Sequence, residues 1–355
     1  SSGTALHLAC RSIVDGDCRT AIVGGVNLIL DPDRFAQLGR LGILSATGRC
    51  LAFGKDADGT LLGEGVGVVV LRRLDDAVAR GDRIYGVIKG TGVSTGSGTV
   101  GFTAPNPQAQ AVAIRRAVDV SGVDPATIAY VETHGTATLL GDPIEVRGLT
   151  LGYGVEDGQG PVRASIGSIK PNVGHLEAGA AVMSLIKVLL QLHHRTLLPS
   201  ITSSDANPQI PFAELPFAIQ RELAPWPGTA GEPRRAAMSS FGVGGAGVHV
   251  ILEEAPLAPP SGAAIDPTGE TAPQLIVLSA RSDASLQAQA RALGEWLDTR
   301  ADAALVDVAW TLGATRRHFE HRAALVASDI ATAKVSLTQL AHGTPDAGTA
   351  LATVA

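Results

Sequence analysis

The fold is decided by the stretch IAYVETHGTAT, residues 128–138, in which an apolar run ends in His134 at a glycine-containing break. The stretch ASIGSIKPNVGHLE, residues 164–177, repeats the pattern and ends near His175. Both runs predict strands, and α/β proteins collect reacting groups at strand ends. If the two strands share a sheet, the histidines converge. Two neutral imidazoles with the Lys170 ammonium nearby could polarise a thioester carbonyl or stabilise an enolate.

Apolar runs and helical patterns alternate as far as residue 254, which predicts a mixed α/β fold with a covered sheet. The valine cluster in Gly65–Leu74 predicts a strand that is buried on both faces. Further strands are expected at 20–30, 83–89, 128–133, 164–169, 213–223, 236–240 and 248–253. Helices are expected at the start of the chain, at 107–120, from 142 to about 150, and at 178–195.

A change of composition at Glu254 predicts a division of the chain into three parts. Residues 1–254 form the main domain, 255–273 a Pro/Ala/Gly linker, and 274–355 a small α/β unit. In the small unit we expect strands at 274–278 and 323–326 and helices at 282–300, 305–311 and 330–342.

Composition excludes several classes of function. The 355 residues carry a net charge of −6, which argues against nucleic-acid binding. The longest apolar stretch, Ala178–Leu192, contains Ser184, Lys187 and Gln191 and therefore predicts a buried helix and not a membrane span. Three cysteines without metal-ligand spacing predict no metal site and a reducing, cytoplasmic location; they are Cys10, Cys18 and Cys50.

The first residues already have a helical pattern and lack an initiator methionine. Ser1 and Ser2 are typical of a helix N-terminus, and Leu6, Cys10 and Ile13 follow at helical spacing. We therefore expect the chain to be a fragment of a longer polypeptide, with apolar surface that the remainder would cover.

Nine short motifs occur in order along residues 1–254: ALHLAC (5–10), IVGGVN (22–27), DG (58–59), GEG (63–65), TAPN (103–106), HGTAT (134–138), GDPIE (141–145), NVGHLE (172–177) and SSFGVGG (239–245). With this set the chain resembles the ketosynthase (β-ketoacyl synthase) domain of modular type I polyketide synthases, a branch of the thiolase-like enzymes. The motif TRRHFEHR (315–322) resembles the linker between a ketosynthase and the following acyltransferase. The resemblance implies a layered thiolase-like α/β fold with an incomplete first half, and assigns 274–355 to that linker domain.

The implied activity is that of an acyltransferase that extends polyketide chains, as in antibiotic biosynthesis. An enzyme cysteine takes an acyl group from a carrier-protein phosphopantetheine, and a malonyl-type extender then condenses with it by decarboxylative Claisen chemistry. The family's cysteine would directly precede Ser1, so this chain alone would be inactive. The implied partners are an acyl carrier protein, an acyltransferase domain of the same polypeptide and a second copy in a homodimer. No cofactor is bound directly.

The resemblance also assigns roles to individual residues. His134 and His175 would bind the extender thioester and stabilise the enolate, and Lys170 would orient the histidines and keep them neutral. Hydrogen bonds to the pantetheine arm would come from Thr136 and Thr138.

The loop in the last motif has an assigned role as well. The backbone N–H of Val243 would contribute to the oxyanion hole, and Phe241 and Val243 would gate the acyl pocket. The chain departs from the family at Ala137, where glycine is usual.

Two alternatives stay open. A fatty-acid-type condensing enzyme would have the same motifs but not the tail motif at 315–322. A non-condensing relative, either a decarboxylase or a scaffold, would lack the cysteine before Ser1. Histidines outside the motifs are predicted to be structural; they are His7, His193, His194, His249, His318 and His321.

Overall fold

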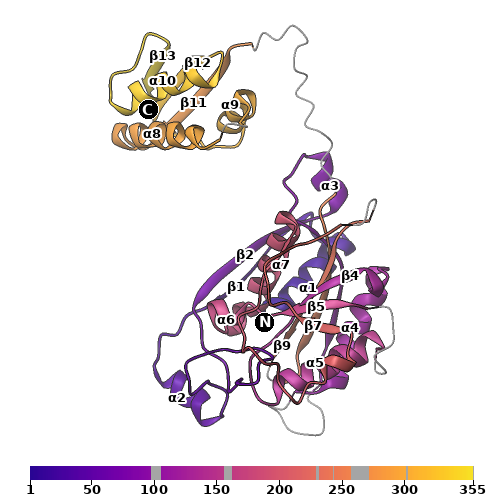
Figure 1. Ribbon diagram of the computed structural model, residues 1–355. Helices are drawn as coiled ribbons and strands as arrows, with labels where there is room; N and C mark the ends of the chain where they lie inside the picture. The colour runs from indigo at the N-terminus through magenta and orange to yellow at the C-terminus, as the bar shows by residue number, and fades with distance from the viewer. Residues whose placement is uncertain are drawn as a thin grey trace. The chain divides into compact units, whose positions relative to one another are not determined.

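The computed structural model describes residues 1–96, 105–155, 162–228, 232–242, 244–256, 272–300 and 303–354. The chain divides into two compact units, Ser1–Leu257 and Ala258–Ala355 (Figure 1). The predicted linker at 255–273 lies mostly outside the described residues. Each unit has a hydrophobic core of its own.

A six-stranded mixed sheet forms the centre of the first unit. Its strands lie in the order β3 (Val87–Ser94), β10 (Gly247–Glu253), β9 (Arg235–Phe241), β4 (Ile128–Glu132), β5 (Ala164–Gly167) and β7 (Phe217–Ile219). Strand β4 runs parallel to β5 and β9, whereas β10 is antiparallel to both β3 and β9. The two strands that precede the candidate histidines are therefore direct neighbours.

Helices cover both faces of this sheet (Figure 1). Helices α4 (Pro107–Ser121) and α5 (Gly141–Tyr153) share one core with it, and α1 (Ser2–Asp15) and α7 (Ala180–His194) share another. Alternation along β4 supplies both cores, since Val131 belongs to the first and Tyr130 to the second. The mixed α/β architecture predicted from the sequence is confirmed.

A second, two-stranded sheet packs on α1 and α7, so the layers alternate between helices and sheets. It pairs β1 (Thr20–Asn27) with β2 (Gly65–Arg72) in antiparallel register. The prediction that β2 is buried on both faces is wrong, because Val66, Val68 and Val70 are 54–69% exposed. Gly67 faces the helices instead: a Cβ there would lie 3.0 Å from side-chain atoms of α7.

Two other predicted strands differ from the structure. The strand expected at 83–89 is β3 at Val87–Ser94, displaced toward glycine-rich sequence. A Cβ on Gly92 would lie 2.1 Å from the carbonyl oxygen of Ala113, so this strand uses glycine to let α4 approach. Of the strand expected at 213–223, only β7 forms. The remaining elements of this unit are short: α2 (Asp33–Arg40), α3 (Leu74–Ala79), α6 (Lys170–Val173), β6 (Thr196–Leu197) and β8 (Ala224–Pro225).

The second unit is an antiparallel sheet in the order β11–β12–β13 with three helices. Its elements are β11 (Gln274–Ala280), α8 (Asp283–Asp298), α9 (Leu305–Ala314), β12 (His321–Ala327), α10 (Ile330–Ala341) and β13 (Thr349–Thr353). Side-chain caps begin two of the helices: Ser282 accepts the N–H of Ser285, and Asp329 accepts that of Thr332. The predicted elements are confirmed, and β13 is an addition.

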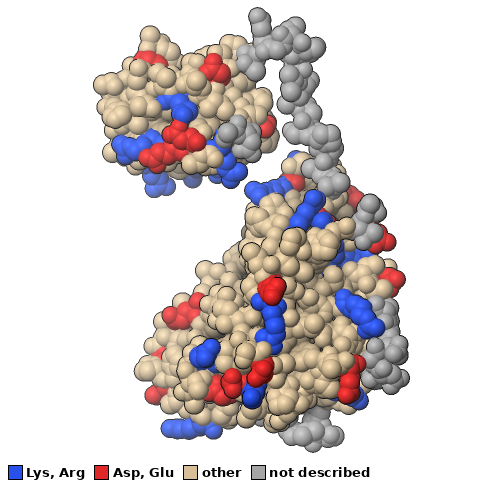
Figure 2. Space-filling model, viewed as in Figure 1, with Lys and Arg blue, Asp and Glu red and all other residues tan. Residues whose placement is uncertain are grey.

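Acidic and basic side chains are interspersed on the face of the molecule shown in Figure 2. Among the described residues no helix has the length and apolar character needed to cross a membrane.

Candidate active site

The end of the β4–β5 pair brings the two histidine motifs together. Glu132 is in register with Gly167, and Thr133 donates both its N–H and its hydroxyl to the Gly167 carbonyl, at 2.8 and 2.7 Å. The rings of His134 and His175 lie with their centroids 5.3 Å apart and nearly perpendicular. The convergence predicted from the two strand ends is therefore observed.

Backbone hydrogen bonds fix His175 to a distant loop. Its N–H donates to the carbonyl of Leu61 at 2.6 Å, and its own carbonyl accepts from Gly63 at 3.2 Å. A Cβ at position 63 would lie 2.0 Å from the carbonyl oxygen of Val173, so only glycine fits there. The His175 Nδ1 accepts the N–H of Glu177 at 2.9 Å. This bond requires an unprotonated Nδ1, which places the ring proton on Nε2.

Lys170 fixes the same tautomer in His134. Its side chain is buried, and its ammonium contacts the His134 carbonyl and lies 3.4 Å from Nδ1. An ammonium can only donate, so His134 Nδ1 accepts and Nε2 carries the proton. Both rings therefore hold an N–H donor at Nε2.

Both histidines are held neutral. Removal from water and, as a smaller cause, the charge of Lys170 lower the pKa of His175 to about 3. The pKa of His134 is lowered well below its usual value by the same two effects and by His175. For both rings, removal from water is the largest cause of the lowered pKa.

Two buried carboxylates hold the backbone of the first histidine motif. Glu145 accepts the N–H groups of His134 and Gly135 at 2.6 and 2.8 Å. Asp142 accepts that of Ala137 at 3.0 Å and that of Phe53 at 2.7 Å. Burial raises the pKa of Glu145 to about 7 and that of Asp142 to about 6.

The N–H that Asp142 accepts belongs to Ala137, the position where the resemblance leads us to expect glycine. Ala137 has a φ of 58°, a left-handed conformation that favours glycine. The sequence contained Glu145 and Asp142 only as letters of a family motif. Glu145 lies ten and eleven residues, and Asp142 five and 89 residues, from the backbone groups that they hold, and such spacing does not by itself indicate that role.

The remaining predicted residues fall into three groups. The hydroxyls of Thr136 and Thr138 lie 3.1 Å apart on the turn after His134. The ring of Phe241 lies 6.1 Å from that of His134, centroid to centroid. Val243 lies outside the described residues.

Other titratable side chains in the first unit, namely His249, Cys10 and Cys50, have surroundings that suit a role in packing. His249 is fully buried and bonded at both nitrogens, to Tyr153 and Ser239. Burial raises the thiol pKa of Cys10 and of Cys50 to about 11, which suits inert thiols. In the described part of the chain no group of three or more His, Cys, Asp or Glu side chains could hold a metal ion.

Family models match three segments of the chain. The beta-ketoacyl synthase N-terminal domain matches residues 1–77 and the beta-ketoacyl synthase C-terminal domain matches residues 85–204. A third model, described as CurL-like, PKS C-terminal, matches residues 274–337 of the second unit.

Curated relatives are much longer than this chain. It is 43% identical over 336 residues to polyketide synthase PksM of Bacillus subtilis, which covers 93% of the chain and 8% of the relative. It is 42% identical over 352 residues to a mycocerosic acid synthase-like polyketide synthase of Mycobacterium tuberculosis, covering 97% of the chain and 16% of the relative.

Solved ketosynthases share its fold. An oxazolomycin ketosynthase domain of Streptomyces albus superposes with a TM-score of 0.89 at 41% identity, over 100% of this chain and 61% of that one. The ketosynthase from module 6 of the Bacillus subtilis bacillaene synthase gives 0.87 at 35% identity, again over 100% and 61%. Sequence, fold and the converging histidine motifs agree, and the chain belongs to the β-ketoacyl synthase family, among the thiolase-like ketosynthase domains of modular polyketide synthases.

Proposed function

We propose that this ketosynthase extends polyketide chains by decarboxylative Claisen condensation of a carrier-protein-bound malonyl-type extender with an acyl-cysteine enzyme. One observation supports it above all: His134 and His175 lie with ring centroids 5.3 Å apart and each has its proton on Nε2. Two N–H donors at that separation suit one developing oxyanion.

Electron movement in the reaction explains why both rings must be neutral. The bond between the malonyl carboxylate and the α-carbon breaks, carbon dioxide leaves, and the electron pair forms an enolate. The enolate carbon attacks the acyl thioester, and the cysteine thiolate leaves. A neutral imidazole with a low pKa donates a hydrogen bond to the enolate oxygen, whereas an imidazolium could transfer its proton and quench the nucleophile.

Other residues take supporting roles in this proposal. Lys170 sets the tautomer of His134 through the contact at Nδ1. Thr136 and Thr138 bind the pantetheine arm, Phe241 gates the acyl pocket, and the backbone of Val243 belongs to the oxyanion hole. The nucleophile is the family's cysteine, directly before Ser1 at the N-terminus of α1, where the helix dipole stabilises a thiolate.

The partners in the proposal follow from the same family. Substrates arrive on the phosphopantetheine of acyl carrier proteins, and no cofactor is bound directly. The match of residues 274–337 to a polyketide synthase C-terminal model supports a linker domain at 274–355, leading to an acyltransferase of the same polypeptide. We further propose a homodimer. Three free cysteines suit a reducing cytoplasm.

The test uses a ketosynthase domain of the length of the solved relatives, with the cysteine present. Acyl loading is followed by intact mass, and carbon dioxide release from malonyl carrier protein is followed separately. His134→Ala and His175→Ala should each lower decarboxylation about 100- to 1,000-fold, since each removes one donor to the oxyanion. Loading should change much less.

Four outcomes separate the alternatives. Normal chain extension in both variants would refute the role of the histidines. Loss of loading with intact decarboxylation would make them bases for the thiol instead. Carbon dioxide release without any condensation, even with the cysteine present, would identify a non-condensing decarboxylase, and neither activity would identify a scaffold.

A further inference from the structure

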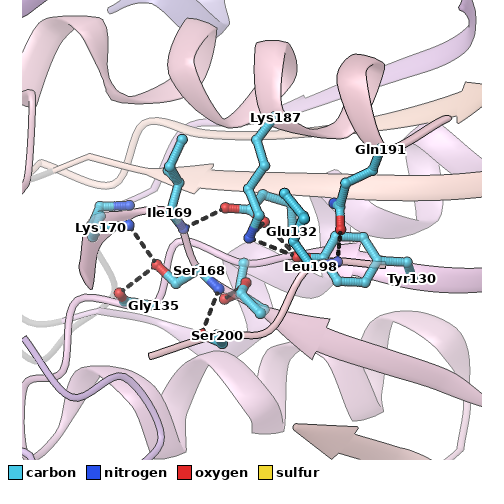
Figure 3. Close-up of polar contacts among 12 residues, drawn as sticks. Tyr130, Glu132, Gly135, Ser168, Ile169, Lys170, Lys187, Gln191, Leu198 and Ser200 are labelled. Atoms are coloured by element: carbon cyan, nitrogen blue, oxygen red, sulfur yellow. Dashed lines mark hydrogen bonds and ion pairs between the residues drawn. The ribbon is translucent and has the colours of Figure 1, made fainter. Parts of the chain in front are cut away.

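A buried ion pair joins Glu132, two residues before His134, to Lys187 (Figure 3). Glu132, at the end of β4, is fully buried, and Lys187 of α7 is almost so. The Lys187 ammonium lies 2.7 Å from Glu132 Oε2, which also accepts the hydroxyl of Tyr130 at 2.7 Å. Lys187 and Tyr130 are themselves 2.9 Å apart. None of these three side chains has a role in the mechanism above.

The other carboxylate oxygen of Glu132 reaches toward the active site. Glu132 Oε1 accepts the N–H of Ile169 at 2.7 Å, and Ile169 directly precedes Lys170 (Figure 3). Glu132 itself lies two residues before His134. One carboxylate thus joins the strand end that carries His134 to the turn that carries Lys170.

Ser168 fixes the same turn from its other side. Its hydroxyl donates to the Gly135 carbonyl at 2.9 Å and accepts the N–H of Lys170 at 3.2 Å. Its own N–H donates to the hydroxyl of Ser200 at 3.2 Å. The backbone from Ser168 to Lys170 therefore has a fixed partner at each of its three N–H groups.

A contribution to folding stability is a weak explanation for the buried Glu132–Lys187 ion pair. Burying two charges costs several kcal/mol per ion, and replacement of a buried pair by apolar residues of similar volume is often neutral or stabilising. Position is a stronger reason, because Lys170 Nζ lies 3.4 Å from His134 Nδ1, near the limit of a hydrogen bond. A small displacement of the turn would remove that contact and release the His134 tautomer.

We propose that the Glu132–Lys187 pair, together with Ser168, is a positioning device for the ketosynthase reaction. Glu132 acts through Ile169: it holds the Ser168–Lys170 turn so that the Lys170 ammonium stays on Nδ1 of His134 and the proton stays on Nε2. Tyr130 holds the Glu132 side chain in the orientation that this requires, and Lys187 balances the buried charge of the carboxylate. The inference rests on the proposed function, since it concerns the donor used in decarboxylation.

Two combined variants separate position from charge. Glu132→Gln/Lys187→Met, the amide variant, removes both charges but keeps an oxygen that can accept the Ile169 N–H. Tyr130→Phe/Glu132→Leu/Lys187→Met, the apolar variant, also removes that acceptor. We expect the apolar variant to lose between about 10- and 100-fold in kcat for decarboxylation, with KM for malonyl carrier protein and acyl loading unchanged. The amide variant should stay within about threefold of the wild type.

The control is Tyr153→Phe, which removes a buried hydrogen bond to His249 in the same unit but away from the turn. It should lower the melting temperature without changing kcat. If the apolar variant fails to fold, Ser168→Ala replaces it, because it loosens the same turn by removing only one hydroxyl. Ser168→Ala should likewise lower kcat and leave KM unchanged.

Ring spectra of His134 test the device independently of activity. With 15N-labelled histidine, and with His134→Ala to assign the signals, the wild type should show the Nε2–H tautomer. The apolar variant or Ser168→Ala should show a mixture of both tautomers. An unchanged tautomer and kcat in a folded apolar or Ser168 variant would refute the proposal, as would equal losses in the amide and apolar variants. If the wild type released no carbon dioxide, the proposed function would fail, and the tautomer would still decide the positioning role.

Discussion

His249, on one side, and the pair His134 and His175, on the other, all have lowered pKa values, but they differ in what their rings contact. The pKa of His249 is lowered to about 3 by burial, as is that of His175, and the pKa of His134 is well below its usual value. Hydroxyls occupy both nitrogens of His249, from Tyr153 and Ser239, each at 2.9 Å. His134 and His175 each have a partner at Nδ1. Among the described residues nothing is hydrogen-bonded to their Nε2.

A low histidine pKa therefore does not by itself identify the candidate active site. Burial produces it wherever a ring is packed, whether or not the ring has a task. The feature that distinguishes His134 and His175 is an Nε2–H that has no hydrogen-bond partner among the described residues. His249 satisfies its own hydrogen bonds and those of its neighbours, and so contributes to stability.

The largest effect should come from replacing His249 and His134 by alanine in separate variants and comparing stability with activity. His249→Ala leaves the Tyr153 and Ser239 hydroxyls buried without their partner, and should lower the free energy of unfolding by about 3 kcal/mol. Denaturant unfolding measures this, and the folded fraction should keep wild-type decarboxylation. His134→Ala should do the reverse, with an unfolding free energy within about 1 kcal/mol of the wild type. The distinction fails if His249→Ala loses activity while remaining folded.

The pH dependence of stability should separate His249 from solvent-exposed histidines. In the unfolded chain its pKa is the ordinary 6.5, so the unfolded state takes up a proton as the pH falls below that value, whereas the folded ring stays neutral until about 3. Stability present above pH 6.5 is therefore lost on acidification. Between pH 6.5 and about 4.5, His249→Gln should lose roughly 2 kcal/mol less than the wild type. Parallel curves for the two proteins would contradict a neutral buried ring.

A smaller effect is expected from Tyr153→Phe. It removes one hydroxyl at Nε2 of His249 and leaves the ring its second partner at Ser239. The free energy of unfolding should fall by about 1–2 kcal/mol, less than in His249→Ala, and decarboxylation should be unchanged. A thermal melt with a parallel carbon dioxide assay measures both. A loss as large as that of His249→Ala would mean that Ser239 contributes nothing.

Sequence predicted the convergence of His134 and His175 because strand ends and glycine breaks are local features. It missed Glu132 and Lys187 as partners, although a signal was present. A glutamate at the end of a buried strand and a lysine in an apolar helix each need a partner of opposite charge. Glu132 and Lys187 are in fact partners of one another. At β2 the sequence misled for a different reason. A run of valines indicates a strand, but the layer that packs on it is set by the tertiary fold, and Val66, Val68 and Val70 turn outward.

The contact between His175 and the Leu61–Gly63 loop has a consequence for recombination between ketosynthases. The N-terminal family model ends at residue 77 and the C-terminal one begins at residue 85, so a crossover at this boundary looks natural. Such a crossover would join a foreign loop to the 2.6 Å bond at the His175 N–H. Only parents with glycine at position 63 could exchange segments there without displacing the His175 ring.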